Sequence, residues 1–270
     1  MLQFVEVSLA DTRRLFHLRQ TSPIDVGLGI KGFDYGWLVA CREWKSSEKI
    51  LDVGGAYSRL PLFLQKNFGC DTWIVDDFAA GSGETFWTRN RSPQEYIDSH
   101  PEMHFLLEYV GDESKSSLPL NSFDVVYSAS VLEHVPSALT PAVWKHMERL
   151  LKPGGELIHA VDVPFPSNGG LRKLLSKYLL DILNPLVPHS YRLAHHLSTP
   201  SNYTGLVCEA LGLPRPDLAK LNTWRMVLDP EVLTESYDHG LNRIVKDQIK
   251  GYRYQRVGSL LLRLKKIARS

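Results

Sequence analysis

The chain has 270 residues, of which 43% are apolar and 23% charged, and its formal net charge is +1. This is an ordinary globular composition with enough apolar chain to bury a core. A net charge near zero gives no overall attraction to nucleic acid, so we expect no nucleic-acid partner. No apolar run reaches the roughly 18 residues of a membrane-spanning helix, so we expect no transmembrane segment.

The cysteines and histidines give no sign of a metal. Cys41, Cys70 and Cys208 are too widely spaced for a zinc site or a disulfide framework. The adjacent His195 and His196 have no carboxylate or thiol at ligand spacing. Reduced thiols, and an N-terminal segment without the apolar stretch of a signal peptide, favour a cytoplasmic setting.

The spacing of apolar residues predicts the secondary structure in chain order. Two helices are expected first, over Leu9–Gln20 and Asp34–Trp44. A strand–turn–helix rhythm follows. Its strands are predicted at Lys49–Val53, Thr72–Val75, Met103–Val110, Phe123–Tyr127 and Glu156–Val163. Its helices are predicted at Leu60–Phe68, after the capping box Ser92–Glu95, and from Thr140 to the Pro153-Gly154-Gly155 turn.

This rhythm predicts a single α/β domain over residues 1–270, with helices up to about residue 48 preceding a mostly parallel sheet covered on both faces. Ligands of such sheets bind beyond the carboxyl ends of the strands. From Pro164 to about Thr223 the rhythm is lost, and we expect this insertion to form a helical lid over the acceptor. Arg256–Lys265 is predicted as the last strand.

The loop after the first predicted strand reads LDVGGAYSR, from Leu51 to Arg59. It lacks the Gly-x-Gly-x-x-Gly spacing that lets a backbone approach a pyrophosphate, because Ala56 and Ser58 stand where glycines would be needed. It also lacks the Gly-Lys-Ser/Thr of a P-loop. The ligand of this loop is therefore expected to be a nucleotide without a pyrophosphate.

Five segments together resemble the class I S-adenosylmethionine-dependent methyltransferases. Asp52-Val53-Gly54 resembles the motif that closes their first strand, and Asp76 stands at the end of the second. The other three are Gly111-Asp112, Leu118–Val135 and Arg149–Asp162. Phe33–Trp37 (FDYGW) also resembles an aromatic segment of some bacterial small-molecule and glycan methyltransferases.

The resemblance implies a Rossmann-like sheet with an antiparallel last strand, and S-adenosyl-L-methionine as the cofactor. Asp76 is expected to hold both ribose hydroxyls, with Asp77 as the competing candidate. Asp112 and Glu113 are expected near the adenine, and Ser128 near the methionine half. The implied cofactor-binding residues are Asp52, Gly54, Gly55, Asp76, Asp112, Glu113 and Ser128.

The implied activity is methyl transfer to a small-molecule acceptor, for which we favour a hydroxyl of a sugar or secondary metabolite. Three alternatives stay open: N-methylation of a small amine, transfer of another adenosyl-linked group such as aminopropyl, and a module that binds the cofactor without turnover. The apolar run Leu171–Leu186 is expected to be a lid helix or a contact in a homodimer, and less readily a membrane-surface helix.

A hydroxyl acceptor needs a base for its proton. His134 follows the fourth predicted strand and Asp162 ends the fifth, so we expect His134 to be the general base and Asp162 its partner or an acceptor-orienting group. His159 lies deeper and on the opposite face, and is expected to be structural. Alternatives are a packing role for His134, a base at His195 or His196, and catalysis by proximity alone.

Overall fold

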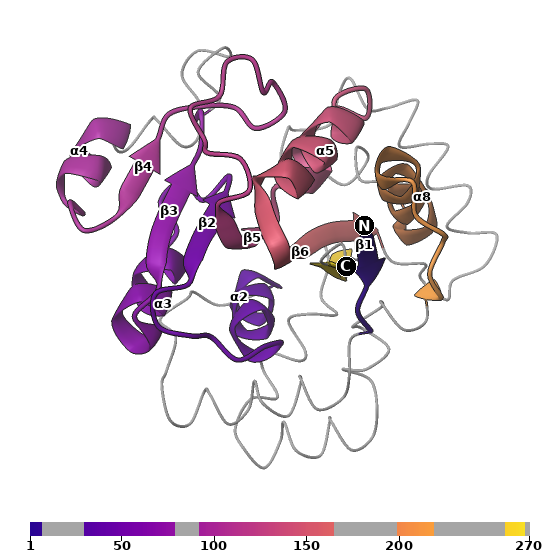
Figure 1. Cartoon of the computed structure of the whole chain (residues 1–270), viewed down its shortest axis with the longest axis horizontal. Helices are drawn as coiled ribbons and strands as arrows, with labels where there is room; N and C mark the ends of the chain where they lie inside the picture. Colours follow the sequence, from indigo (N-terminus) through magenta and orange to yellow (C-terminus); the bar gives the residue numbers. More distant parts are fainter. Residues whose placement is uncertain (7–29, 79–91, 165–198, 219–256, 268–270) are drawn as a thin grey trace, which may run out of the picture.

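The structure is a computed structural model, and it describes residues 1–6, 30–78, 92–164, 199–218 and 257–267 (Figure 1). Most of the lid segment, the helix expected at Leu9–Gln20 and the histidine pair at 195–196 lie outside these described residues. No helix among the described residues is long and apolar enough to cross a membrane.

A seven-stranded sheet with the order β1-β7-β6-β5-β2-β3-β4 forms the centre of the molecule. Only β7 runs antiparallel to its neighbours, β6 and β1, and the other pairings are parallel. The strands are β1 (Leu2–Phe4), β2 (Lys49–Val53), β3 (Asp71–Val75), β4 (His104–Leu106), β5 (Phe123–Ala129), β6 (Leu151–Pro164) and β7 (Val257–Lys266). The expected Rossmann-like sheet with its antiparallel last strand is thereby confirmed.

Helices cover both faces of this sheet (Figure 1). They are α2 (Ile30–Ala40), α3 (Leu60–Phe68), α4 (Pro93–Asp98), the 3-10 turn η1 (Leu132–His134), α5 (Thr140–Leu150) and α8 (Pro200–Leu211). Alternate residues of each central strand face opposite ways. Val125 and Ile158 pack under α2 and α3, whereas Val126 and Leu157 pack under α5 and α8. Both faces are thus buried, as a parallel sheet requires.

Helix α8 lies within the segment that the sequence left irregular, and it belongs to the core. The Thr199 side chain accepts a hydrogen bond from the Asn202 N–H at 3.3 Å, Pro200 stands in the first turn, and Gly212 ends the helix with φ 65°. Its buried Tyr203 and Val207 join the hydrophobic cluster that contains Trp144. The acceptor insertion expected over about residues 164–223 stays a prediction, since residues 165–198 and 219–223 lie outside the described residues.

Two strand predictions need correction, and one strand was missed. The third predicted strand, Met103–Val110, is only His104–Leu106, because this edge strand pairs with β3 alone and leaves Leu107 and Tyr109 exposed. The N-terminal strand β1 was not predicted, and it forms by pairing with β7. The fifth predicted strand begins earlier, at Leu151, and includes the Pro-Gly-Gly turn as an irregularity.

Two helix predictions also need correction. The second helix ends at Ala40 and not at Trp44. Helix α4 begins at the predicted capping box, but Ser92 makes no side-chain capping hydrogen bond. The Pro93 ring and the extended backbone of Ser92 are sufficient to start this short helix.

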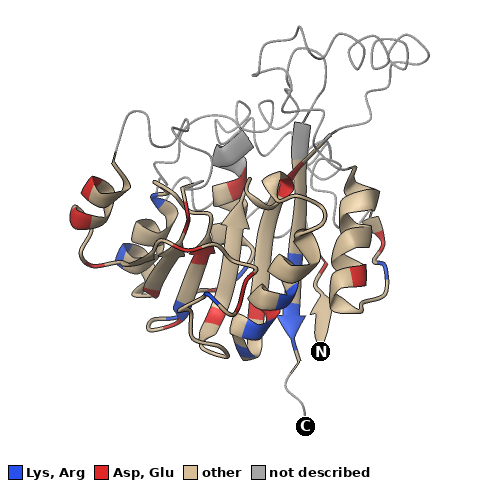
Figure 2. Ribbon diagram, turned by 90° about the horizontal axis from the view of Figure 1, so that it is seen from above, with Lys and Arg blue, Asp and Glu red and all other residues tan. Residues whose placement is uncertain are grey.

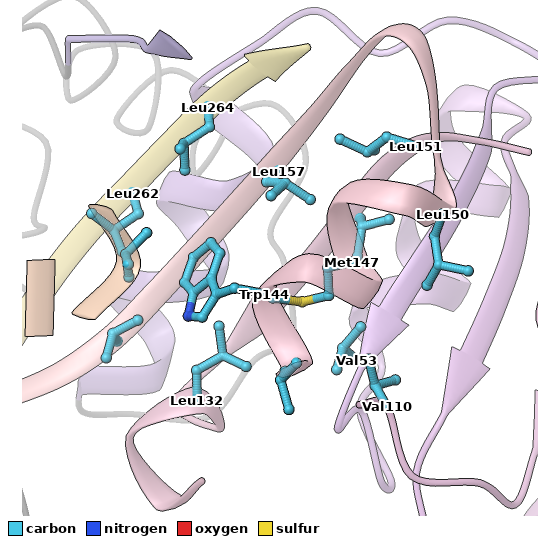
Figure 3. Packing of buried hydrophobic residues seen from close by; sticks show 14 of the residues in the cluster. Val53, Val110, Leu132, Trp144, Met147, Leu150, Leu151, Leu157, Leu262 and Leu264 are labelled. Atoms are coloured by element: carbon cyan, nitrogen blue, oxygen red, sulfur yellow. The ribbon is translucent and has the colours of Figure 1, made fainter. Parts of the chain in front are cut away.

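The indole of Trp144 fills the space between α5, β6 and β7 (Figure 3). Replacing this fully buried side chain by alanine should lower the free energy of unfolding by about 3–5 kcal/mol, because packing and transfer energy are both lost. Urea unfolding followed by circular dichroism measures this. Leu139→Ala, five residues earlier and 46% exposed, is the control and should change stability by under about 0.5 kcal/mol. Equal effects of the two changes would contradict the packing.

Candidate functional site

The loop after β2 packs closely against the loop after β5. Gly54 has φ +72°, and its N–H donates to the Val75 carbonyl at 2.8 Å. A Cβ at Gly54 would overlap the side chain of Val131, which directly follows β5 and Ser130. Glycine is therefore required here by both its conformation and its neighbour. The first and fourth predicted strand ends meet at this point.

Asp52 lies beneath this loop and not at its surface. A Cβ at Gly55 would lie 2.8 Å from the Asp52 carboxylate and 3.0 Å from Ile74. Asp52 is only 3% exposed. Its charge also acts on Tyr35 of α2, whose pKa rises to about 12 through burial first and then through Asp52. The carboxylate thus supports the loop from below, between β2 and α2.

Asp76 closes β3 and holds the glycine loop from the other side. Its Oδ2 accepts the Ala56 N–H at 2.8 Å, and its Oδ1 accepts the Phe78 N–H at 2.6 Å. Ala56 bends toward it with φ +40°. Burial raises the pKa of Asp76, although both backbone hydrogen bonds oppose that rise. A carboxylate offers about four acceptor sites, so each oxygen can still accept a further hydroxyl.

The loop after β4 carries Asp112 and Glu113, and both carboxylates are engaged by nearby side chains. Asp112 accepts from the Ser114 hydroxyl at 2.6 Å and pairs with Lys115 at 3.0 Å, and these contacts lower its pKa. Glu113 pairs with Arg149 at the end of α5. These two residues therefore shape the loop that would face an adenine.

His146 is a contact of this loop that sequence reasoning missed. Its Nδ1 accepts the Gly111 N–H at 3.1 Å, which ties the loop after β4 to α5. Burial lowers the pKa of His146, and the neutral ring is the form that can accept this hydrogen bond. His146 lies among the buried residues of α5, and this position in the helical pattern was the signal from which the contact could have been predicted.

Ser128 lies in the interior of the sheet. Its hydroxyl is 2.8 Å from His159 Nδ1, and both residues are fully buried. The His159 ring meets the edge of Trp144, and burial lowers its pKa to about 3. This supports the structural role expected for His159. Because its hydroxyl is engaged by His159, Ser128 could contact a ligand through its backbone groups and not through its side chain.

Carboxyl groups gather where β5 and β6 end. The Ser130 hydroxyl lies 3.2 Å from both Asp34 of α2 and Asp162 of β6, and Ser259 of β7 also donates to Asp34. Glu133 in η1 is nearby, since the charges of Asp162 and Asp34 both act on it. We call Asp34, Ser130, Glu133 and Asp162 the carboxyl cluster. Figure 2 shows acidic segments at this edge of the sheet, away from both termini.

Exposed His134 stands beside this cluster. Its Nε2 is 3.7 Å from Glu133 Oε1, and its side chain is 56% exposed against 1% for Glu133. Glu133 was not among the predicted site residues, although it adjoins His134 in the sequence. The predicted pairing of His134 with Asp162 stays a prediction, and the structure shows a contact of His134 with Glu133.

Residues 51–159 match the family model described as a methyltransferase domain. The segment is similar to that family over less than half of the chain, and the order of the strands matches the Rossmann-like fold expected from the sequence. This span runs from β2 through β6 and includes both the glycine loop and the carboxyl ends of β3 and β5. A search of curated proteins gave no significant match.

Among solved structures, a methyltransferase shares the fold of this chain. A Haemonchus contortus phosphoethanolamine N-methyltransferase superposes with a TM-score of 0.55 at 14% identity, over 97% of this chain and 61% of that one. That chain is therefore substantially longer. A geranyl diphosphate C-methyltransferase from Streptomyces coelicolor has a TM-score of 0.48 at 13% identity, over 88% of this chain and 76% of that one.

Gly54 and Gly55 let the loop pack closely on its neighbours, because Cβ atoms at these positions would overlap the side chains of Val131 and Asp52. Asp76 retains acceptor capacity beside this loop, which suits the two hydroxyls of a ribose. The sheet brings the Asp52, Asp76 and Asp112 segments to one edge, and it brings His134 and Asp162 to the neighbouring strand ends.

The buried Glu133 makes the stability of the domain depend on pH. Burial first, and then the charges of Asp162 and Asp34, raise the pKa of Glu133 well above its ordinary value. An acid with a raised folded pKa contributes stability below its unfolded pKa of about 4.3, and this stability is lost as the pH rises through the folded pKa. Glu133→Gln replaces the acid by a neutral amide and so removes this loss of stability. The variant should therefore gain stability relative to the wild type from about pH 4 to pH 8.

Urea unfolding at intervals across this range measures the difference. Glu102→Gln, at an exposed position after α4, is the control and should run parallel to the wild type. A constant difference between Glu133→Gln and the wild type would show that Glu133 is ionised in the folded state throughout.

Proposed function

We propose that this domain transfers a methyl group from S-adenosylmethionine to a hydroxyl of a small molecule, such as a sugar or a secondary metabolite. The observation that supports this most is an exposed histidine, His134, held beside a buried carboxyl at the carboxyl ends of β5 and β6. A histidine so placed can act as the base that a hydroxyl acceptor requires.

The cofactor would lie across the loops after β2, β3 and β4. Asp76 would hold the ribose hydroxyls, while Gly54 and Gly55 allow close approach of the backbone. Asp52 would support this loop from below, and Asp112 and Glu113 would shape the adenine side through Lys115 and Arg149. When bound, the cofactor supplies a methyl group that is already activated on a sulfonium. The residues of this chain therefore have to align the acceptor and manage its proton.

His134 would take the proton of the acceptor hydroxyl as the new carbon–oxygen bond forms. Glu133 lies 3.7 Å from its ring, and the imidazolium that results would favour the ionised form of this carboxyl and be stabilised by it. Asp162, bonded to Ser130, would orient the acceptor from the end of β6. Proximity supplies the remainder of the rate, since the two strand ends are adjacent in the sheet.

N-methylation of a small amine is the second candidate. The carboxyl cluster supports this candidate, because carboxylates attract an ammonium group and one of them can take its proton, which frees the electron pair that attacks the methyl. Chemical analysis of the methylated product distinguishes the two, since an O-methyl ether and an N-methyl amine fragment differently in mass spectrometry. A module without turnover would bind the cofactor and yield neither product.

Asp76→Ala should weaken S-adenosylmethionine binding by roughly 1.5–3 kcal/mol, the range for hydrogen bonds to a charged group. Isothermal titration calorimetry on folded protein measures it. Asp77→Ala, the adjacent carboxylate, is the matched control and should leave the affinity within a few-fold. If Asp77→Ala caused the larger loss, the ribose assignment would move to that residue.

His134→Ala should lower the maximal rate by about 100- to 10,000-fold, the usual contribution of a positioned base, with cofactor affinity little changed. The measurement is turnover at saturating acceptor over a range of pH, because loss of a base also flattens the pH profile. His100→Ala, on the far edge of the sheet beside α4, is the control. A drop of under roughly fivefold would exclude His134 as the base.

A further inference from the structure

The turn that follows β4 rests against α5 at Gly111. Gly111 has φ +137°, in the region that favours glycine, and a Cβ there would lie 3.0 Å from the Val143 side chain of α5 and 3.2 Å from the Tyr109 ring. Val110 is buried in the cluster that contains Val143 and also Val53, at the end of β2 (Figure 3). The backbone of this turn therefore lies close to α5, on the side of the sheet where the glycine loop begins.

One side chain of α5 holds the backbone of this turn. His146 Nδ1 accepts the Gly111 N–H at 3.1 Å, and His146 is only 1% exposed. Because Nδ1 can accept only while it carries no proton, the ring is neutral and its single proton is on Nε2. Nε2 has no hydrogen-bond partner among the described residues. A second ring proton would therefore turn the acceptor of Gly111 into a donor, with no acceptor from these residues to compensate.

The charged groups around His146 come from the same loop and from α5. Burial has the largest effect on the ring and lowers its pKa from the ordinary value of about 6.5. The charge of Glu113 raises the pKa, Arg149 lowers it, and Glu108 and Asp112 raise it by lesser amounts. These charges do not outweigh burial, so both the hydrogen bond and the surroundings of the ring favour its neutral form.

The loop that this hydrogen bond fixes is also held at its base and by the end of α5. Glu108 accepts from the Ser117 N–H at 2.9 Å, which closes the loop, and Arg149 pairs with Glu113 one turn after His146. The ion pair is partly exposed and therefore weak, since water screens it. The bond from Gly111 to His146 is the buried tie, and its loss would leave a backbone N–H near α5 without its acceptor.

The same loop continues into Asp112 and Glu113, which are expected beside the adenine. We propose that His146 is a positioning residue for the cofactor: its neutral ring fixes the turn at Gly111, and protonation of the ring frees this turn and weakens cofactor binding. This inference rests on the proposed function, because it requires S-adenosylmethionine to bind beside the loop after β4. It adds that a residue behind the loop makes this binding depend on pH.

The direction of the pH dependence follows from the ring. Above its folded pKa, His146 is neutral and the turn is held, so the full cofactor affinity is present. As the pH falls through that pKa, the ring gains a proton and this part of the affinity is lost. The effect is reciprocal, so a bound cofactor should favour the neutral ring and lower the pKa of His146 further.

The first test measures the dissociation constant of S-adenosylhomocysteine by calorimetry, on folded protein, at about pH 8 and about pH 5, on either side of the ordinary histidine pKa. His146→Asn keeps an acceptor, Oδ1, near the position of Nδ1 and does not titrate. Between the two pH values the wild type should lose about 3- to 10-fold more affinity than His146→Asn, the fold-change for one hydrogen bond. His146→Leu has no acceptor and should bind about 3- to 10-fold more weakly than the wild type at the higher pH.

His100→Asn, beside α4 at the far edge of the sheet, removes an imidazole outside this loop and should keep the wild-type pH dependence. Equal pH dependence in the wild type and His146→Asn would overturn the proposal. So would affinity at the higher pH that is the same in His146→Leu as in the wild type.

The second test uses the wild type alone, so it holds even if a variant fails to fold. Nitrogen-15 NMR of protein with labelled histidine shows which ring nitrogen carries the proton, and the ring of His146 is identified by its contact with the Gly111 amide proton. At neutral pH its Nδ1 should be unprotonated, and S-adenosylhomocysteine should lower the pKa of the ring. A protonated Nδ1, or a pKa unchanged by binding, would overturn the proposal. If no S-adenosylhomocysteine bound at any pH, the proposed function would fail, whereas binding that is independent of His146 would contradict this inference alone.

Discussion

The parallel pairing of β2 between β3 and β5 is the constraint on which the rest of the site depends. Asp52 pairs in register with Ile74 on one side and Tyr127 on the other. Because these strands run in the same direction, their carboxyl ends reach one edge of the sheet, and every loop that follows them meets there. The contacts from Gly54 to Val131, and from Ala56 to Asp76, are direct results of this register.

The elements that build this edge could be predicted from sequence because their signals are local. The short apolar run Lys49–Val53, which is buried from Ile50 onward, and Gly69 in the left-handed conformation after α3 are properties of a few neighbouring residues. Strand β1 could not be found in this way, since three residues form a strand only where β7 offers an edge. Helix α8 did carry local signals, Thr199-Pro200 and Gly212, which the surrounding irregular sequence obscured.

The positions of the candidate site residues could be predicted better than the atoms that they contact. Strand ends follow from the apolar pattern, so Asp76, Asp112, His134 and Asp162 could be placed near them, and their roles stay predictions. Which atoms meet depends on the face of the strand and on distant elements. Ser128 points into the core because it shares the α5 face with His159, whereas Ser130 reaches Asp34 from a helix almost a hundred residues earlier. No spacing rule connects residues across that separation.

Buried polar groups on the two faces of the sheet differ in how they limit buried charge. On the α5 face, Ser128 and His159 bond to each other, and the low pKa of His159 keeps the ring uncharged, so no net charge is buried. On the α2 face, the Ser130 hydroxyl lies between Asp34 and Asp162, Ser259 donates a second hydroxyl to Asp34, and the charges of both aspartates act on Glu133. A fold gains nothing in stability from crowding carboxyl groups in this way. Burial and the charges of Asp162 and Asp34 raise the pKa of Glu133, so its protonated form is favoured and less charge is buried at this edge of the sheet than three ionised carboxyl groups would bring.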